Sequence, residues 1–309
     1  VGLCVSKAIA VNSQLNPPDI VTSGANSTVT YLSFSQAGFT AYGNGWPGGS
    51  AAPAKFASNG TSMLDMNGNG VGQVADSCLS GTSEYVVGYV GSDPCVWIDG
   101  TISLLSKGSF SAIYPTGVAP ASGGGVVICG SDYGTMQPVI WAGGNDPYPL
   151  EITGYTTAET KKVATHGSNT YVVGYVNNEN GVQPALWTNG VLSVLDTGSS
   201  SNGYAQAVAV LASGDIYVAG FCFGGPSGTR ATLWINGTLN EYSPGPLESF
   251  LIVGLGITSN SDVVIAAQGY IGGQSIPALW TNGVVSILDK GTHAEGYLNG
   301  LAVDGTDVY

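Results

Sequence analysis

Residues 214–243, GDIYVAGFCFGGPSGTRATLWINGTLNEYS, contain the pattern that decides the fold of this chain. An apolar run ending in YVAG precedes a loop rich in Gly and Ser, and ATLW, Asn-Gly and a second apolar run follow. Runs rich in Val, Ile, Tyr and Trp that are bounded by Gly, Asn and Ser favour strands. Asn-Gly between two such runs is typical of a tight hairpin turn. The stretch therefore predicts short strands, the last two of which form a hairpin.

The same pattern recurs along the chain, with a further apolar stretch before each YVxG-like element, as in QAVAVLASGD at 206–215. Each unit therefore predicts four short strands, and no long helical period of apolar residues is present. Four-stranded units of about 45 residues are typical of β-propeller blades. The aromatic residue of the third strand marks each unit, and these anchors, spaced by 41, 44, 46, 47 and 46 residues, are Phe56, Trp97, Trp141, Trp187, Trp234 and Trp280.

The chain ends supply material for one more unit. NGLAVDGTDVY at 299–309 matches a first and a second strand, and VSKAIAVNS at 5–13 with PPDIVTSG at 17–24 can provide a third and a fourth. An anchor near Val11 lies 45 residues before Phe56, in step with the rest. The chain length also favours seven units. Dividing 309 residues by seven gives 44.1 residues per unit, within the range of the anchor spacings, whereas dividing by six gives 51.5, which exceeds every spacing. We predict an all-β, seven-bladed propeller, one domain over 1–309, whose last blade joins both chain ends; six blades are the alternative.

Two of the units, 169–196 and 214–243, resemble the repeats of uncharacterised secreted bacterial propeller proteins with a YVAGY…ATLWKNG pattern. The resemblance extends over essentially the whole chain, although Phe56 replaces Trp in the first unit and the last unit has neither Trp nor Asn-Gly. A loose similarity to Kelch repeats lacks the double glycine of that family. The resemblance implies the propeller fold and a location outside the cytoplasm. It implies no catalytic residue.

Composition excludes several classes of function. Only 7 Lys and Arg accompany 20 Asp and Glu, so the net charge of −13 argues against a nucleic-acid partner. No apolar run approaches the length of a transmembrane helix. The N-terminus lacks the features of a signal peptide and is interpreted as a mature or trimmed start. Few cations and many small polar residues favour a secreted or cell-envelope protein. Five Cys without CxxC spacing and two His predict no metal site, and we expect no cofactor.

The candidate binding residues are aromatic. In a propeller, the loops from the second to the third strand and from the fourth strand to the next blade share one face, here called the long-loop face. Rigid amphipathic rings among Asn, Ser and Gly are typical of recognition surfaces for proteins or sugars. Three aromatic residues that directly follow the recurring glycine of the pattern are instead expected to pack between blades: Tyr89, Tyr175 and Phe221. The residues assigned to ligand or partner binding are Trp46, Tyr133, Tyr204, Phe223, Tyr270 and Tyr297.

Catalytic signals are weak. Asp76, His166 and Asp304 form the one constellation that the repeat alignment assembles, but each is better interpreted as a residue of a turn between first and second strands. Neither a nucleophile-elbow, a zinc-protease nor a phosphate-loop motif is present. Asp65, Asp196 and Asp289 follow fourth strands and are expected to cap the next loop. We therefore expect a binding or scaffold protein rather than an enzyme, which contacts a protein, a glycan or copies of itself; the alternative is a carbohydrate-active enzyme with acidic residues in the central funnel.

Overall fold

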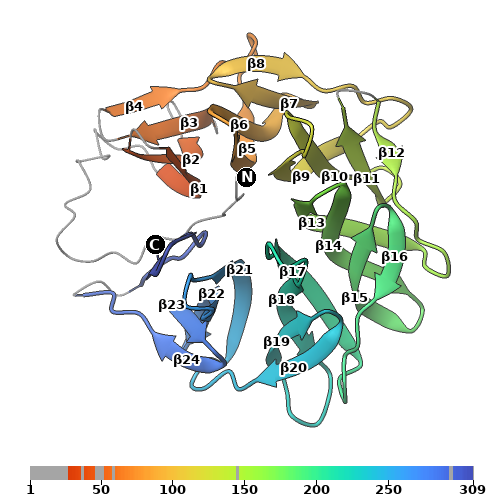
Figure 1. The fold of residues 1–309 in the computed structure, drawn as a ribbon, viewed down its shortest axis with the longest axis vertical. Coiled ribbons are helices and arrows are strands. Elements are labelled where there is room, and N and C mark those ends of the chain that lie inside the picture. The colour runs from red at the N-terminus through yellow and green to blue at the C-terminus, as the bar shows by residue number, and fades with distance from the viewer. Residues whose placement is uncertain are drawn as a thin grey trace.

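The structure, a computed structural model, describes residues 27–35, 38–45, 52–57, 60–143, 146–291 and 295–308. These residues form strands and turns, and no helix that could cross a membrane is found among them. Six antiparallel sheets of four strands each are arranged around a centre, with the first strand of each sheet innermost and the fourth at the periphery (Figure 1). The all-β propeller architecture is confirmed.

The six sheets are here called blades A to F, in chain order. The bounds of their strands are β1 Ser27–Ser35, β2 Gly38–Gly45, β3 Ala52–Ala57 and β4 Gly60–Met63 in blade A; β5 Gly72–Ser80, β6 Ser83–Val90, β7 Asp93–Ile98 and β8 Thr101–Leu104 in blade B; β9 Ile113–Pro120, β10 Val126–Asp132, β11 Gln137–Ala142 and β12 Tyr148–Pro149 in blade C; β13 Thr157–His166, β14 Asn169–Asn178, β15 Gly181–Thr188 and β16 Val191–Val194 in blade D; β17 Asn202–Val210, β18 Ile216–Phe223, β19 Arg230–Ile235 and β20 Thr238–Tyr242 in blade E; and β21 Ser249–Ile257, β22 Val263–Ile271, β23 Gln274–Thr281 and β24 Val284–Ile287 in blade F.

The Asn-Gly pair forms the expected tight hairpin between third and fourth strands. In blade E, Asn236 and Gly237 both have positive φ, 50° and 82°, as a turn matched to the twist of a hairpin requires. The Asn236 carboxamide also accepts the N–H of Ile216 at 2.8 Å and donates to Asp215 at 2.9 Å. Asn189 and Asn282 make equivalent bonds in blades D and F. The asparagine thus joins two turns of its own blade, which explains why the pattern repeats it.

The tryptophan anchors connect successive blades. The indole of Trp234 in blade E is fully buried and donates from Nε1 to the carbonyl oxygen of Asp196, just after blade D, at 2.7 Å. Trp97, Trp141, Trp187 and Trp280 donate in the same way to the preceding blade. The expected caps are confirmed as well, because the carboxylates of Asp65, Asp196 and Asp289 each accept a backbone N–H two residues ahead.

The core lies between the blades, where the apolar face of one sheet packs on the next. Four cysteines, Cys78, Cys95, Cys129 and Cys222, are buried there. Burial raises the pKa of Cys129 to about 11 and that of Cys95 to about 12, so these thiols serve as packing groups.

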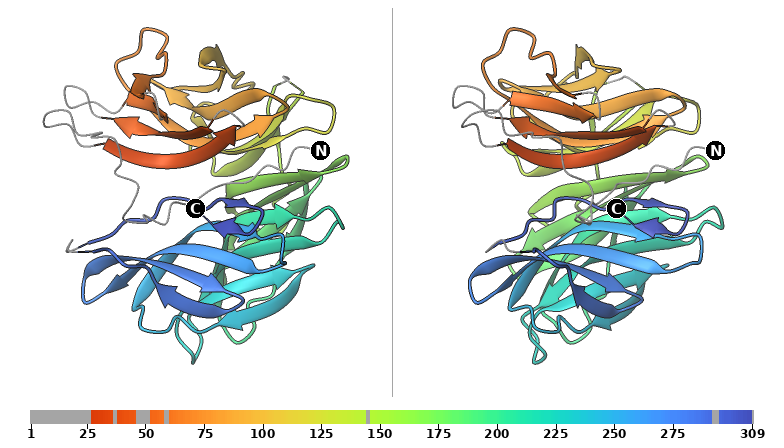
Figure 2. Two further views of the ribbon diagram at one scale, coloured as in Figure 1. Left: turned by 60° about the vertical axis from the view of Figure 1, so that its left-hand side comes forward. Right: turned by 90° about the vertical axis from the view of Figure 1, so that its left-hand side faces the viewer.

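A further two-stranded sheet, β25 Val303–Asp304 and β26 Asp307–Val308, lies beside blade F on the side toward blade A (Figures 1 and 2). Leu301 is fully buried and packs with Leu298 against Val264 and Ala266 of β22. Residues 298–308 thus continue the ring beyond the sixth four-stranded sheet. The proposed partners of this segment, around Val11, lie outside the described residues, so the count of seven blades stays a prediction.

Candidate functional site

The candidate site is a set of equivalent residues at the start of the innermost strands, on the long-loop face. In each of blades A to F, the inner strand has one extra residue relative to the second strand with which it pairs. The residue two positions before this extra residue occupies the equivalent place in all six blades. These rim residues are paired with a second-strand residue of their own blade, and Tyr297 continues their spacing after blade F. The rim residues are Thr28, Gln73, Tyr114, Glu159, Tyr204, Leu251 and Tyr297.

The paired second-strand position contacts the next blade in one of two ways. Where it is polar, its side chain accepts a backbone N–H from beyond its own blade. Asn44 accepts that of Val74 and Ser131 that of Thr160, both on the next inner strand, and Gln268 accepts that of Leu298 in the segment after blade F. Where it is aromatic, its ring meets a ring of the next inner strand, and the centroid distances are 5.0 Å for Tyr89–Tyr114, 4.9 Å for Tyr175–Tyr204 and 6.0 Å for Phe221–Phe250. The expectation that Tyr89, Tyr175 and Phe221 pack between blades is confirmed.

These contacts extend into two aromatic clusters on the long-loop face. The first joins Tyr89 and Tyr114 to Tyr133, whose side chain is 47% exposed, with 5.8 Å between the last two ring centroids. In the second, Phe223 stacks on Tyr204 at 5.9 Å with an interplanar angle of 9°. Tyr175, Phe221 and Phe250 complete the second cluster. The rings of Tyr204 and Phe223 are half-buried and hence partly open to solvent, as are the other rings of the clusters except the exposed Tyr133 and the buried Phe250.

Glu159 lies between the two clusters. Its carboxylate binds the ammonium of Lys161 at 2.9 Å, and the same ammonium lies 5.4 Å from the ring centroid of Tyr175. Burial raises the pKa of Tyr175, and a hydrogen bond to the Glu159 carboxylate raises it further. The pKa of Tyr133 is also raised, by burial and by the charge of Glu159. The carboxylate therefore faces tyrosines of both clusters and connects them into one surface.

The structure brings together some of the predicted site residues. Tyr133, Tyr204 and Phe223 belong to the surface around Glu159. Tyr270 and Tyr297 are 39% and 66% exposed, lie near each other, and the Tyr297 hydroxyl donates to Glu295 at 2.6 Å. Within the described residues, no ring contact joins this pair to the two clusters. Trp46 lies outside the described residues.

Sequence reasoning missed Glu159 and Lys161. Lys161 is the extra residue of inner strand β13, and the segment TAETKKV does not reveal this irregularity, in which the Lys161 ammonium contacts Glu159. Another carboxylate on this face, Asp132, serves the fold. Burial opposes its charge, but hydrogen bonds from the Thr135 hydroxyl and from backbone N–H groups, including that of Ala112, outweigh burial and lower the pKa of Asp132.

The constellation of Asp76, His166 and Asp304 does not form as the sequence alignment grouped it. Asp76 lies in the middle of β5, so its interpretation as a turn residue is wrong, and its carboxylate binds Lys162 at 2.7 Å and the N–H of Val118. His166 ends β13 and Asp304 ends β25. The described residues contain no cluster of three His, Cys, Asp or Glu side chains suited to a metal ion.

No protein-family model and no curated protein matches the sequence. Solved structures are similar in fold. Virginiamycin B lyase from Staphylococcus aureus has a TM-score of 0.61 at 8% identity, with 92% of this chain and 94% of that chain covered. The extracellular domain of a hybrid two-component system from B. thetaiotaomicron has a TM-score of 0.53 at 10% identity, with 92% and 36% covered. A puromycin-hydrolysing peptidase from Mycobacterium tuberculosis has a TM-score of 0.53 at 13% identity, with 84% and 43% covered.

These findings correct one expectation. The sequence led us to expect that the chain is not an enzyme, and that expectation is overturned because the similar structures include a lyase and a peptidase. Absence of a known catalytic motif therefore does not argue against catalysis on this fold. At identities of 8–13% the likeness shows the fold alone, since one fold can carry many activities.

Proposed function

We propose that this protein binds a saccharide at the long-loop face, on the surface formed by Glu159 and the aromatic residues on both sides of it. The proposal includes a location outside the cytoplasm. Three observations support this location: the scarcity of Lys and Arg, the resemblance of the repeats to secreted bacterial propeller proteins, and the presence of an extracellular domain among the similar structures.

The observation that carries the proposal is the placement of one carboxylate between two groups of rings. A sugar ring presents an apolar C–H face, which packs on aromatic rings, and an edge of hydroxyl groups, which donate to a carboxylate. Tyr133 and the stacked pair of Tyr204 and Phe223 offer rings that solvent can reach. Glu159 offers the acceptor, and Lys161 both holds it in place and can donate to a hydroxyl oxygen.

The rigidity of the surface favours binding. Tyr175 and Tyr204 are fixed by an edge-to-face contact between two blades, and Glu159 is held by Lys161 and by the Tyr175 hydroxyl. Groups that are already ordered in the free protein lose little conformational entropy when the ligand binds. A saccharide is favoured over a protein partner because the acceptor is a single half-buried carboxylate among rings rather than an extended apolar patch with a charged rim.

A glycan array tests the proposal with the tag-free protein and matched variants. Tyr204→Ala removes a ring of the surface, Glu159→Gln removes the charge of the acceptor, and Tyr242→Ala removes an equally half-buried ring from outer strand β20. We expect saturable binding to one glycan class that is at least about tenfold weaker in the first two variants, since a lost ring or charged hydrogen bond costs about 1–3 kcal/mol. The Tyr242→Ala variant should bind like the unaltered protein.

An array without binding, or binding that neither Tyr204→Ala nor Glu159→Gln weakens, would contradict the proposal. Because enzymes are found among the similar structures, the glycan that binds should also be incubated with the protein and its mass followed over time. A constant mass indicates recognition alone, whereas a changed mass indicates that the same surface supports a reaction.

A further inference from the structure

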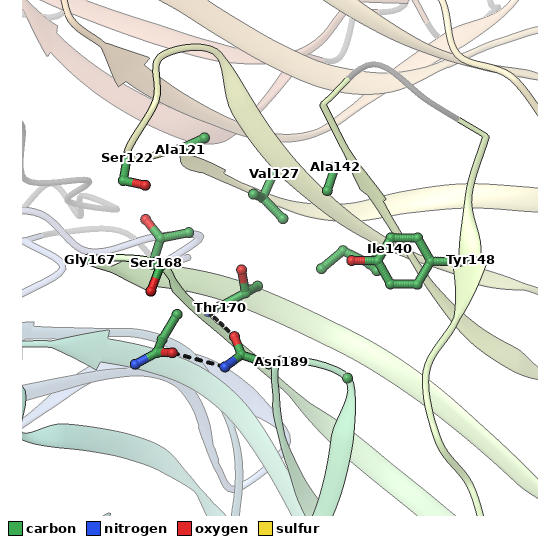
Figure 3. A pocket seen from close by; sticks show the side chains of 13 residues that line it. Ala121, Ser122, Val127, Ile140, Ala142, Tyr148, Gly167, Ser168, Thr170 and Asn189 are labelled. Atoms are coloured by element: carbon green, nitrogen blue, oxygen red, sulfur yellow. Dashed lines mark hydrogen bonds between the residues drawn. The ribbon is translucent and has the colours of Figure 1, made fainter.

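A groove of about 330 Å³ lies on the face opposite the long loops, between blades C and D (Figure 3). Its walls come from the turn after β9, from β10 to β12, and from both turns of blade D on that face. No pattern in the sequence indicates this groove. All of its lining residues differ from those of the surface around Glu159.

The groove lies where blade C departs from the repeat. In blade D, the third and fourth strands pair as far as Thr188 and Val191, and a two-residue turn connects them. In blade C, the pairing ends at Ile140 and Tyr148, and β12 has only two residues. The Tyr148 ring, 48% exposed, therefore lies at one end of the groove instead of within a regular outer strand (Figure 3).

The floor of the groove is lined by apolar side chains and its edge by polar ones, and none of the lining side chains is charged. Val127 and Ile140 are buried and form the apolar floor. Ser122, Ser168 and Asn169 provide hydroxyl and carboxamide groups at the edge.

The carboxamide of Asn169 is held in one orientation. Its Oδ1 accepts from Asn189 Nδ2 at 2.9 Å, while Asn189 Oδ1 accepts the N–H of Thr170 at 2.9 Å (Figure 3). The edge of the groove thus presents polar groups whose positions are set before a ligand arrives, which reduces the entropy lost on binding.

We propose that this groove is a second binding site and that its ligand is a small neutral saccharide. A charged ligand would lose hydration without gaining a partner of opposite charge in this lining. A neutral pyranose matches it, because its C–H face packs on the Val127–Ile140 floor and the Tyr148 ring, and its hydroxyl groups bond the serines and Asn169. The volume lies near the lower end of small-molecule sites, about 300–1,000 Å³, and admits about one or two sugar rings.

The test uses saturation-transfer NMR with a panel of neutral mono- and disaccharides and a uronic acid of the same size. All variants contain Tyr204→Ala, which disables the surface proposed above on the other face, so that the two proposals are tested separately. Ser168→Tyr fills the groove from an exposed turn, and Tyr148→Ala removes its ring. Thr82→Tyr places the same ring at the equivalent exposed turn position of blade B and is the matched control.

We expect a neutral saccharide to bind the Tyr204→Ala protein, with affinity reduced at least about tenfold by Ser168→Tyr and by Tyr148→Ala and unchanged by Thr82→Tyr. The uronic acid should bind more weakly than its neutral counterpart. The proposal is overturned if no neutral saccharide binds the Tyr204→Ala protein, if groove variants bind as well as the control, or if the uronic acid is preferred. Thermal unfolding of each variant, at unchanged midpoint, shows that a loss of binding does not come from misfolding.

Discussion

The ammonium group of Lys162 on β13 lies 2.7 Å from Asp76 on β5, although a whole blade separates these two inner strands. Asp76 is 2% exposed, and its other carboxylate oxygen accepts the N–H of Val118 on the intervening β9 at 3.1 Å. Gly117 permits this approach, because a Cβ atom there would lie 3.0 Å from the Cα atom of Lys162. The ion pair therefore ties three consecutive inner strands together.

Removing one member of this pair should destabilise the protein strongly. Lys162→Met leaves the buried carboxylate of Asp76 without its counter-charge, and we expect the free energy of unfolding to fall by about 3–5 kcal/mol in urea titrations. The double variant Asp76→Leu with Lys162→Met should recover most of the loss. Lys161→Met, which breaks the more exposed pair with Glu159, should cost less than about 1 kcal/mol. Equal losses for Lys162→Met and Lys161→Met would contradict the structural role.

The tryptophan hydrogen bond between blades should contribute measurably to stability. Trp234→Phe keeps an aromatic ring but leaves the carbonyl oxygen of Asp196 without the indole donor. We expect a loss of about 1–3 kcal/mol in the free energy of unfolding, measured by denaturant titration. Tyr242→Phe, which removes a hydroxyl from a half-buried ring of the same blade, serves as the control and should change it by less than about 0.5 kcal/mol. A loss no larger than the control's would count against the anchor interpretation.

The sequence predicted the repeated architecture because its signals are local. The turn at Asn236–Gly237 and the anchor Trp234 each act within one hairpin or on the adjacent blade, so one unit suffices to recognise them. The candidate site is different. Glu159 lies near Tyr133, which belongs to another blade, and Asp76 pairs with Lys162, which is 86 residues further along the chain. No local pattern encodes such pairings, and for that reason the sequence placed Asp76 in a turn.

The buried thiols should make the protein less stable in mild alkali. Burial raises the pKa of Cys95 to about 12 and those of Cys129 and Cys222 to about 11, whereas a thiol in the unfolded chain has a pKa of about 8.5. Between about pH 9 and 10 the unfolded chain has lost these protons and the folded protein keeps them, so raising the pH favours unfolding. Each thiol then adds up to about 1.4 kcal/mol of lost stability per pH unit.

This dependence is measured by urea titrations at several pH values in the presence of a reductant. Replacing Cys95, Cys129 and Cys222 by Ala together should flatten the decline in the free energy of unfolding between about pH 9 and 10. A decline of the same steepness in the triple variant would show that other groups cause it.

Continuation of the ring past blade F should matter for stability. Leu301 is fully buried against blade F, and a Cβ atom on Gly254 of β21 would lie 2.4 Å from the Cβ atom of Leu301. Leu301→Ala should lower the free energy of unfolding by about 2–5 kcal/mol. Gly254→Ala should also destabilise, because backbone atoms of residue 301 leave no room. Wild-type stability in both variants would show that residues 298–308 do not belong to the packed ring in solution.

Saccharide binding by the surface around Glu159 is tested by calorimetric titration with the glycan selected on the array. We expect a binding isotherm for the unaltered protein, an affinity at least about tenfold lower for Tyr204→Ala and for Glu159→Gln, and an unchanged affinity for Tyr242→Ala. Equal affinities in all four proteins, with each variant folded by thermal unfolding, would contradict it and place the binding site elsewhere on the propeller.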